Sequence, residues 1–258
     1  MASVLIAVIY LAFVSMGLPD AILGAAWPTM HLEMSVPLSW AGVISFLIAS
    51  GTVISSLMSD RMIRRFGTGW VTLFCTGLVT LALLGFSCSN QFWQLCLLAL
   101  PYGLGAGSID AALNNYVALH YKSRHMSWIH FFWGVGAAAG PSIMGACLTG
   151  GLGWNAGYRT VFFIQLFMTA ALFLTLPMWK KAVGEGESKA PKESESTAAA
   201  LKMPGAKAVM VAFFATARWR ALRACGPAVF WCPCAGWMRI RRPAGLRCSM
   251  WALRSGDF

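Results

Sequence analysis

Six long apolar segments dominate the sequence, and they restrict its fold more than any other feature. Their approximate ranges are 3–30, 39–58, 69–88, 92–120, 127–149 and 158–179. Each reaches about the 20 residues that an α-helix needs to cross a hydrocarbon core of roughly 30 Å. Only 11% of the residues are charged, against about 25% in ordinary soluble domains. The pattern predicts a chain with six membrane spans.

These spans are expected to be helices. Backbone groups in lipid must find their hydrogen-bond partners within the helix or within a closed barrel. Strands of an outer-membrane barrel alternate apolar and polar residues, whereas runs such as residues 95–100 (LCLLAL) do not alternate. We therefore predict an all-α transmembrane fold.

The charges of the connecting segments alternate along the chain. Loops 59–68 and 121–126 carry Arg and Lys, and basic residues follow the sixth span. Loops 31–38, 89–91 and 150–157 carry neither. Because basic loops stay in the cytoplasm, this alternation predicts a cytoplasmic N-terminus and a multi-pass protein of the inner (plasma) membrane.

Composition divides the chain into four parts. Residues 1–181 form the six-span bundle, and residues 182–204 are polar and poor in aromatic residues, which is typical of a flexible cytoplasmic linker. An apolar run over 205–216 reads as the start of a seventh span. Residues 217–258 form a basic tail with eight Arg, no Lys and one acid, so it holds +7 of the net charge of +11.

The basic tail reads poorly as a designed segment, since its Arg residues interrupt every apolar run. Our leading hypothesis is a frameshift near residues 215–218, which leaves the C-terminal half of a larger protein missing. A basic membrane-surface or nucleic-acid segment and a zinc-binding tail built on Cys225, Cys232, Cys234 and Cys248 remain alternatives, although the cysteine spacing is irregular for zinc.

Resequencing the locus tests the frameshift hypothesis. The expected result is an intact downstream frame that encodes five or more further apolar spans. A locus without such a frame would contradict the hypothesis.

A basic motif lies between the second and third spans. Its residues are Ser56, Asp60, Arg61, Arg64 and Arg65. The motif resembles the signature loop of the major facilitator superfamily, Gly-x-x-x-Asp/Glu-Arg-x-Gly-Arg/Lys-Arg/Lys, with Ser56 at the first Gly. The resemblance implies the N-terminal six-helix bundle of that fold, with a gating role for this loop. A loop that only orients the spans is the alternative.

Polar side chains inside the spans are the second unusual feature. An acid within a span costs about 2.5–3.5 kcal/mol on insertion scales, so it usually faces the protein interior and serves a function. Asn114 follows Asp110 by four residues, and helix geometry therefore places both on one face. The candidates for a polar, aromatic pocket that binds solute and protons are Asp20, Trp27, Asp110, Asn114, His130 and Trp133.

Each candidate also has a structural interpretation. Asp20 can lie at a water-exposed end of the first span, and Asp110 can accept a hydrogen bond between helices. His130 can be a packing residue, and both indoles can pack or anchor the chain at the membrane interface.

The order of these residues is similar to that of the fucose permease-like branch, which contains proton-coupled sugar symporters. Asp20 and Asp110 fall where that branch has an Asp and a Glu, and Asn114 matches an Asn. His130 and Trp133 replace a Gln and an Asn. The resemblance implies proton-coupled uptake of a sugar or similar small polar solute by alternating access.

A glycine motif in the fifth span keeps a second function open. Gly136, Gly140 and Pro141 are partly similar to a motif of drug/proton antiporters, which implies efflux, although close helix packing explains the same residues. The sequence has no phosphate loop and no catalytic or metal motif, so we predict neither an enzyme nor a cofactor. The expected partners are membrane lipid, a small solute and protons, and not nucleic acid.

Overall fold

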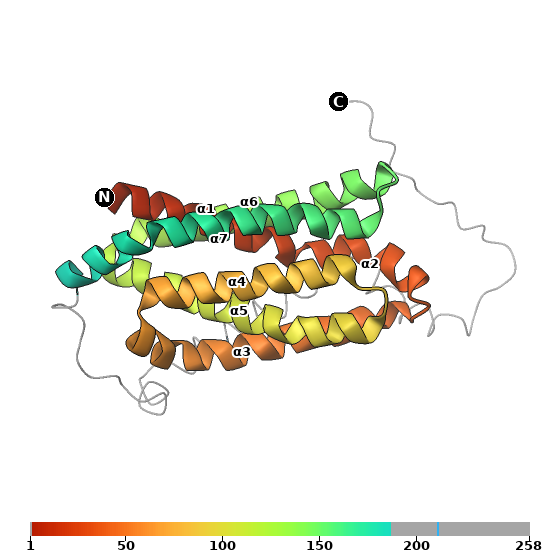
Figure 1. Ribbon diagram of the computed structural model, residues 1–258, viewed down its shortest axis with the longest axis horizontal. Helices are drawn as coiled ribbons and strands as arrows, with labels where there is room; N and C mark the ends of the chain where they lie inside the picture. The colour runs from red at the N-terminus through yellow and green to blue at the C-terminus, as the bar shows by residue number, and fades with distance from the viewer. Residues whose placement is uncertain (1, 187–210, 212–258) are drawn as a thin grey trace, which may run out of the picture. The chain divides into compact units, whose positions relative to one another are not determined.

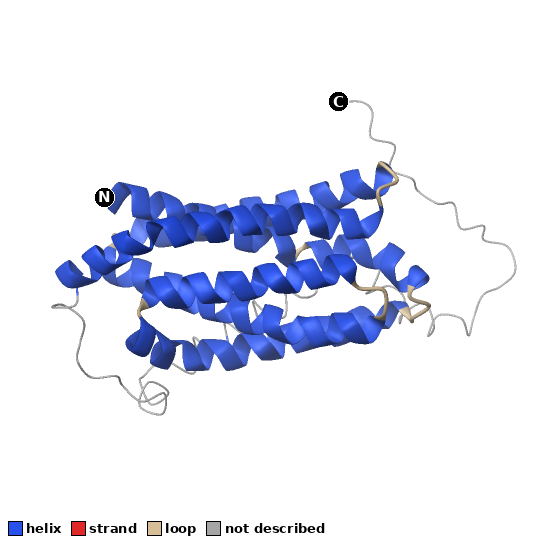
Figure 2. Cartoon of the chain, in the orientation of Figure 1, coloured by secondary structure: helices blue, strands red, loops and turns tan. Residues whose placement is uncertain are grey.

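The structure is a computed structural model that describes residues 2–186 and Val211. Within these residues the chain is almost entirely helical and contains no strand (Figure 2). The predicted all-α fold is confirmed. The predictions for residues 187–204, for the seventh span apart from Val211, and for the basic tail lie outside the described residues.

The helices of the described part follow one another with short connections. In order along the chain they are α1 (Ala2–Asp20), α2 (Ile22–Glu33), the short 3-10 helix η1 (Leu38–Trp40), α3 (Ala41–Phe66), α4 (Thr68–Cys88), α5 (Phe92–His120), α6 (Ser123–Thr149) and α7 (Gly153–Gly186).

Six segments of this part are long and apolar enough to cross a membrane. Helices α1 and α2 form the first crossing, Val4–Glu33, and η1 with α3 forms the second, Leu38–Phe66. The others are α4, α5, α6 and the segment Gly153–Trp179 of α7. Successive crossings run in opposite directions, so the start of α1, the connection at Gly67 and the end of α7 lie at the same end of the bundle (Figure 1).

The predicted loop 59–68 is wrong in its extent. Helix α3 continues through Phe66, and Gly67 alone connects it to α4, with a positive φ of 81°. The helix can continue because Arg64 and Arg65 in its last turn complement the negative end of the helix dipole. Likewise α7 continues to Gly186, so the first five residues of the predicted linker are helical.

Glycines allow a close approach of several helix pairs, among them α1 with α6 and α3 with α5. In the α1–α6 pair, a Cβ added to Gly17, Gly136 or Gly140 would lie within 3.0 Å of a backbone carbonyl oxygen of the facing helix. Gly103 and Gly107 of α5 meet the backbone of α3 in the same way. Small residues allow such close contacts between membrane helices. The packing interpretation of Gly136 and Gly140 is therefore confirmed.

The close contact predicts that Gly136→Val destabilises the bundle. The added side chain would meet the Val14 carbonyl, and overpacking of this kind costs about 1–3 kcal/mol or more. Thermal unfolding in detergent should show a midpoint several degrees lower than that of the unmodified chain. Gly134→Val is the matched control, since a Cβ at Gly134 meets nothing within 4 Å. Equal midpoints for the two variants would contradict the role of the contact.

Candidate functional site

Asp20 lies at a break in the first crossing. It is the last residue of α1, and Ala21 separates it from α2. Pro19 contributes to this break because it has no N–H, so the Ser15 carbonyl lacks its usual donor within the helix. Asp20 therefore lies near the middle of the crossing rather than at its end, and its side chain is exposed.

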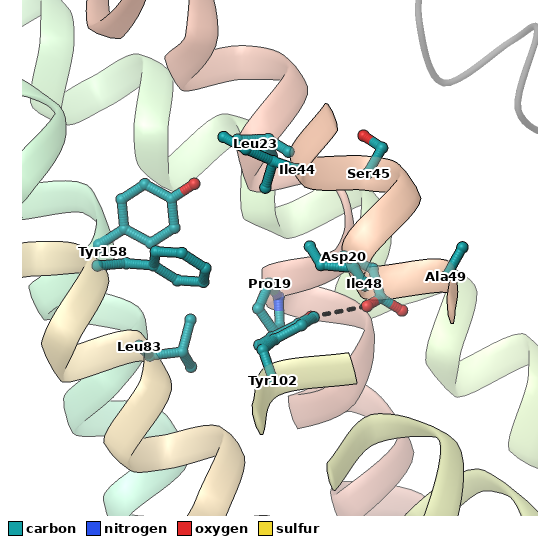
Figure 3. A pocket seen from close by; sticks show the side chains of 11 residues that line it. Pro19, Asp20, Leu23, Ile44, Ser45, Ile48, Ala49, Leu83, Tyr102 and Tyr158 are labelled. Atoms are coloured by element: carbon teal, nitrogen blue, oxygen red, sulfur yellow. Dashed lines mark hydrogen bonds between the residues drawn. The ribbon is translucent and has the colours of Figure 1, made fainter. Parts of the chain in front are cut away.

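Two neutral donors hold the Asp20 carboxylate. The Tyr102 hydroxyl of α5 donates to Oδ1 at 2.8 Å, and the Trp133 indole N–H of α6 donates to Oδ2 at 2.9 Å (Figure 3 shows the Tyr102 bond). Hydrogen bonds to a charged acceptor are stronger than those between neutral groups. The Asp20 carboxylate thus connects α1, α5 and α6 by hydrogen bonds at one depth of the bundle.

The glycine contact places Trp133 beside Asp20. Gly17 lies three residues before Asp20 in α1 and packs against the backbone carbonyl of Trp133 in α6. Gly136 and Gly140 continue this contact along α6 towards Leu18. The backbones of α1 and α6 are therefore close enough for the Trp133 indole to reach the carboxylate.

A cavity of about 210 Å³ opens beside Asp20. Its inner part is formed by buried side chains of four helices, namely Ile44, Leu83, Phe86, Tyr102 and Tyr158. Exposed residues, among them Asp20, Ser45 and Ala49, form its mouth. Figure 3 shows the Tyr102 hydroxyl directed at Asp20 and the Tyr158 hydroxyl directed towards Leu23 and Ile44. The cavity is mostly apolar and aromatic, with one carboxylate.

Asp110 forms a second polar group near the first. Asn114 Nδ2 donates to the Asp110 carboxylate and to the Asp110 carbonyl oxygen, each at 2.9 Å. Electrostatic interactions connect Asp110 with His130 of α6 and with Asp20. His130 also packs edge-on against Phe13, with ring centroids 6.0 Å apart. The structure therefore brings five of the six predicted residues into one polar region, although Asp110, Asn114, His130 and Trp133 do not line the cavity.

The sixth predicted residue, Trp27, lies apart from this region. It is buried, its indole N–H donates to the Leu38 carbonyl at 2.7 Å, and its ring packs against Phe92. These contacts are those of the packing interpretation. An unbroken helix would place Trp27, seven residues after Asp20, on the same face as that acid, but the break at Ala21 interrupts the helix.

The signature residues occupy the last three turns of α3. Asp60 and Arg64 form an ion pair at 2.7 Å, but both side chains are more than half exposed. Pairs of this spacing on a helix surface contribute about 0.3–0.5 kcal/mol. Arg61 and Arg65 are also exposed, and Ser56 donates to the Gly107 carbonyl of α5 at 3.3 Å. In this structure the motif forms no buried charge cluster among the described residues.

Three aromatic residues that line the cavity are not among the candidates predicted from the sequence. Phe86, Tyr102 and Tyr158 lie within apolar runs, where an aromatic residue usually indicates packing. Gln165, seven residues after Tyr158 in α7, is a polar residue within an apolar run. Gln165 is fully buried, and neither amide atom has a hydrogen-bond partner within the described residues.

Across the residues that the structure describes, no group of three His, Cys, Asp or Glu residues is placed to hold a metal.

A sequence profile of the Major Facilitator Superfamily matches residues 9–253. The chain belongs to this superfamily. Superfamily members are membrane transporters, which agrees with six apolar helices and a polar region inside the bundle. The matched range runs through the linker and most of the basic tail, so it does not end near residue 216. The frameshift hypothesis stays a prediction.

A yeast protein is among the curated relatives of this superfamily chain. "Bypass of stop codon protein 6" of Saccharomyces cerevisiae is 24% identical over 173 residues. The alignment covers 65% of this chain and 34% of the yeast protein. The chain thus spans about a third of the length of the curated relative that it matches.

The hydrogen bond between Tyr102 and Asp20 predicts that Tyr102→Phe destabilises the superfamily bundle. A hydrogen bond to a charged group contributes about 1.5–3 kcal/mol, so the thermal midpoint in detergent at neutral pH should fall by several degrees. Tyr158→Phe is the control, because the Tyr158 hydroxyl makes no hydrogen bond to another described residue and lines the same cavity. An equal effect of both variants would contradict the stabilising role of this bond.

Proposed function

We propose that the protein carries out proton-coupled uptake of a sugar or a similar small polar solute by alternating access. The observation that carries this proposal is the position of Asp20, a carboxylate near the middle of the first crossing with donors from two further crossings. A charged side chain at this depth is costly, so an acid inside a membrane span usually serves transport or coupling.

Asp20 and Asp110 are the proposed proton-linked acids. Their charges interact, so protonation of one carboxylate changes the energy of ionising the other. Two such acids in contact with solute can release a proton on one side of the membrane and take it up on the other. This is the requirement for coupling solute movement to a proton gradient.

The side chains around Asp110 suit a hydroxylated solute. Asn114 offers an amide, His130 an imidazole and Trp133 an indole face on which a sugar ring can stack. Asp110 and His130 are exposed on the surface of the described bundle, so a solute can reach both side chains.

The basic end of α3 is the proposed gate. The pair of Asp60 and Arg64 is exposed here, and it can exchange partners without a large desolvation cost. With Arg61 and Arg65 it would hold one conformation closed on the cytoplasmic side, where we also propose that the N-terminus lies, in the inner (plasma) membrane. Alternating access further requires a second six-helix half, against which this bundle rocks.

Efflux by proton antiport is the second candidate. The observation that favours it is the cavity beside Asp20, whose inner wall is apolar and aromatic rather than rich in hydrogen-bonding groups. A screen of radiolabelled sugars for uptake and a panel of drugs for efflux, in cells that express both halves, separates the two functions.

The proposal predicts that Asp110→Asn abolishes pH-dependent uptake in a version of the protein that carries both halves. The amide keeps the size of the side chain and its contact with Asn114 but cannot exchange a proton. Uptake of radiolabelled solute should then no longer respond to an imposed pH gradient. Glu33→Gln is the control for loss of one acid, since Glu33 lies at the end of the first crossing and binds Trp154. Unchanged proton-coupled uptake in Asp110→Asn would contradict the proposal.

A further inference from the structure

We propose that the cavity beside Asp20 is a binding site for a small organic monocation with an alkylated ammonium head. The inference goes beyond sugar uptake, because it concerns a cavity to which Asp110, Asn114 and His130 do not contribute. Asp20 takes part in both proposals, so the tests of this inference measure binding alone and do not depend on sugar transport.

The charge of the site is set by one carboxylate at its mouth. Asp20 is the only carboxylic acid among the eleven residues that line the cavity, and no Lys, Arg or His is among them. Both hydrogen bonds to Asp20 come from the neutral groups of Tyr102 and Trp133. The carboxylate is thus held in place but its charge is not compensated, which favours a cation of one positive charge.

The inner wall of the site suits the alkyl groups of such a cation. Phe86 packs against Tyr102 and Tyr158, with ring centroids 6.2 and 5.5 Å away. Aromatic faces attract cations through their quadrupoles, and clusters of such rings recognise quaternary ammonium groups. Leu83 and Ile44 complete the wall with apolar surface that methyl groups can contact.

The same wall disfavours a sugar or a drug-sized compound in this cavity. A sugar needs several donors and acceptors, and besides Asp20 the polar side chains here are Ser45, Tyr102 and Tyr158. The Tyr102 hydroxyl already donates to Asp20. The volume of about 210 Å³ is also below the roughly 300–1,000 Å³ of pockets for drug-sized ligands. A compact cation fits these limits best.

The test compares a cation with its neutral counterpart on the purified chain in lipid nanodiscs. The probes are choline, its uncharged carbon isostere 3,3-dimethylbutan-1-ol, and glucose, with binding measured by titration calorimetry. Choline should bind at least about tenfold more tightly than the isostere, a difference of about 1.4 kcal/mol, and glucose should not bind. Equal binding of choline and its isostere would overturn the proposal. Because no transport is measured, failure here leaves the proposed transport function untouched.

Variants assign the binding to this cavity. Asp20→Asn should weaken choline binding at least about tenfold and leave the isostere unaffected, since it removes only the charge. Phe86→Leu keeps an apolar wall but removes a ring, so choline should bind about three- to tenfold more weakly. Glu33→Gln is the control, because Glu33 does not line the cavity, and its binding should match the unmodified chain. Choline binding by Asp20→Asn as tight as that of the unmodified chain would overturn the assignment to this cavity. If a variant fails to fold, the comparison of choline with its isostere on the unmodified chain still tests the proposal.

Discussion

Backbone contacts at glycines are the constraint on which the rest of the bundle depends. Lipid tails are as apolar as leucine side chains, so close packing and hydrogen bonds, rather than the hydrophobic effect, hold membrane helices together. Among the described residues, glycines meet the backbone of a facing helix in the pairs α1 with α6 and α3 with α5, and Gly105 does so between α5 and α4. In the first pair the contact at Gly17 lies three residues from Asp20, and it brings Trp133 to hydrogen-bonding distance of that carboxylate. Packing and the polar site therefore share the same few residues.

Hydropathy predicted the crossings well and the helix ends poorly. Apolar length is what lipid selects, so all six spans are visible in the sequence. A helix end is set instead by capping and electrostatics, which hydropathy does not measure. Hydropathy predicts an end of α3 at residue 58, but the helix continues through Phe66. Asp60 forms an ion pair with Arg64 one turn later, and the positive charges of Arg64 and Arg65 stabilise the C-terminal end of the helix. Charged residues therefore extend α3 beyond the end that its hydropathy predicts.

The polar site was predictable only where a residue was unusual for its surroundings. Asp20 and Asp110 stand out because acids are rare in spans, and residues at helical spacing from Asp110 could be added. Tyr102 could not be found in this way, since a tyrosine in an apolar run usually packs. Helical spacing from Asp20 does not locate Trp27, because the helix is broken at Ala21 between them. Such spacing holds only within an unbroken helix.

The connection at Gly67 has a mechanical consequence. A single residue with positive φ joins α3 to α4, and a chain can extend by only about 3.3–3.6 Å for each residue. The end of α3 therefore cannot move far without pulling the start of α4 with it. Helix α4 also packs against α5 and α7, so this short tether would pass a displacement of the arginine-bearing end into the centre of the bundle.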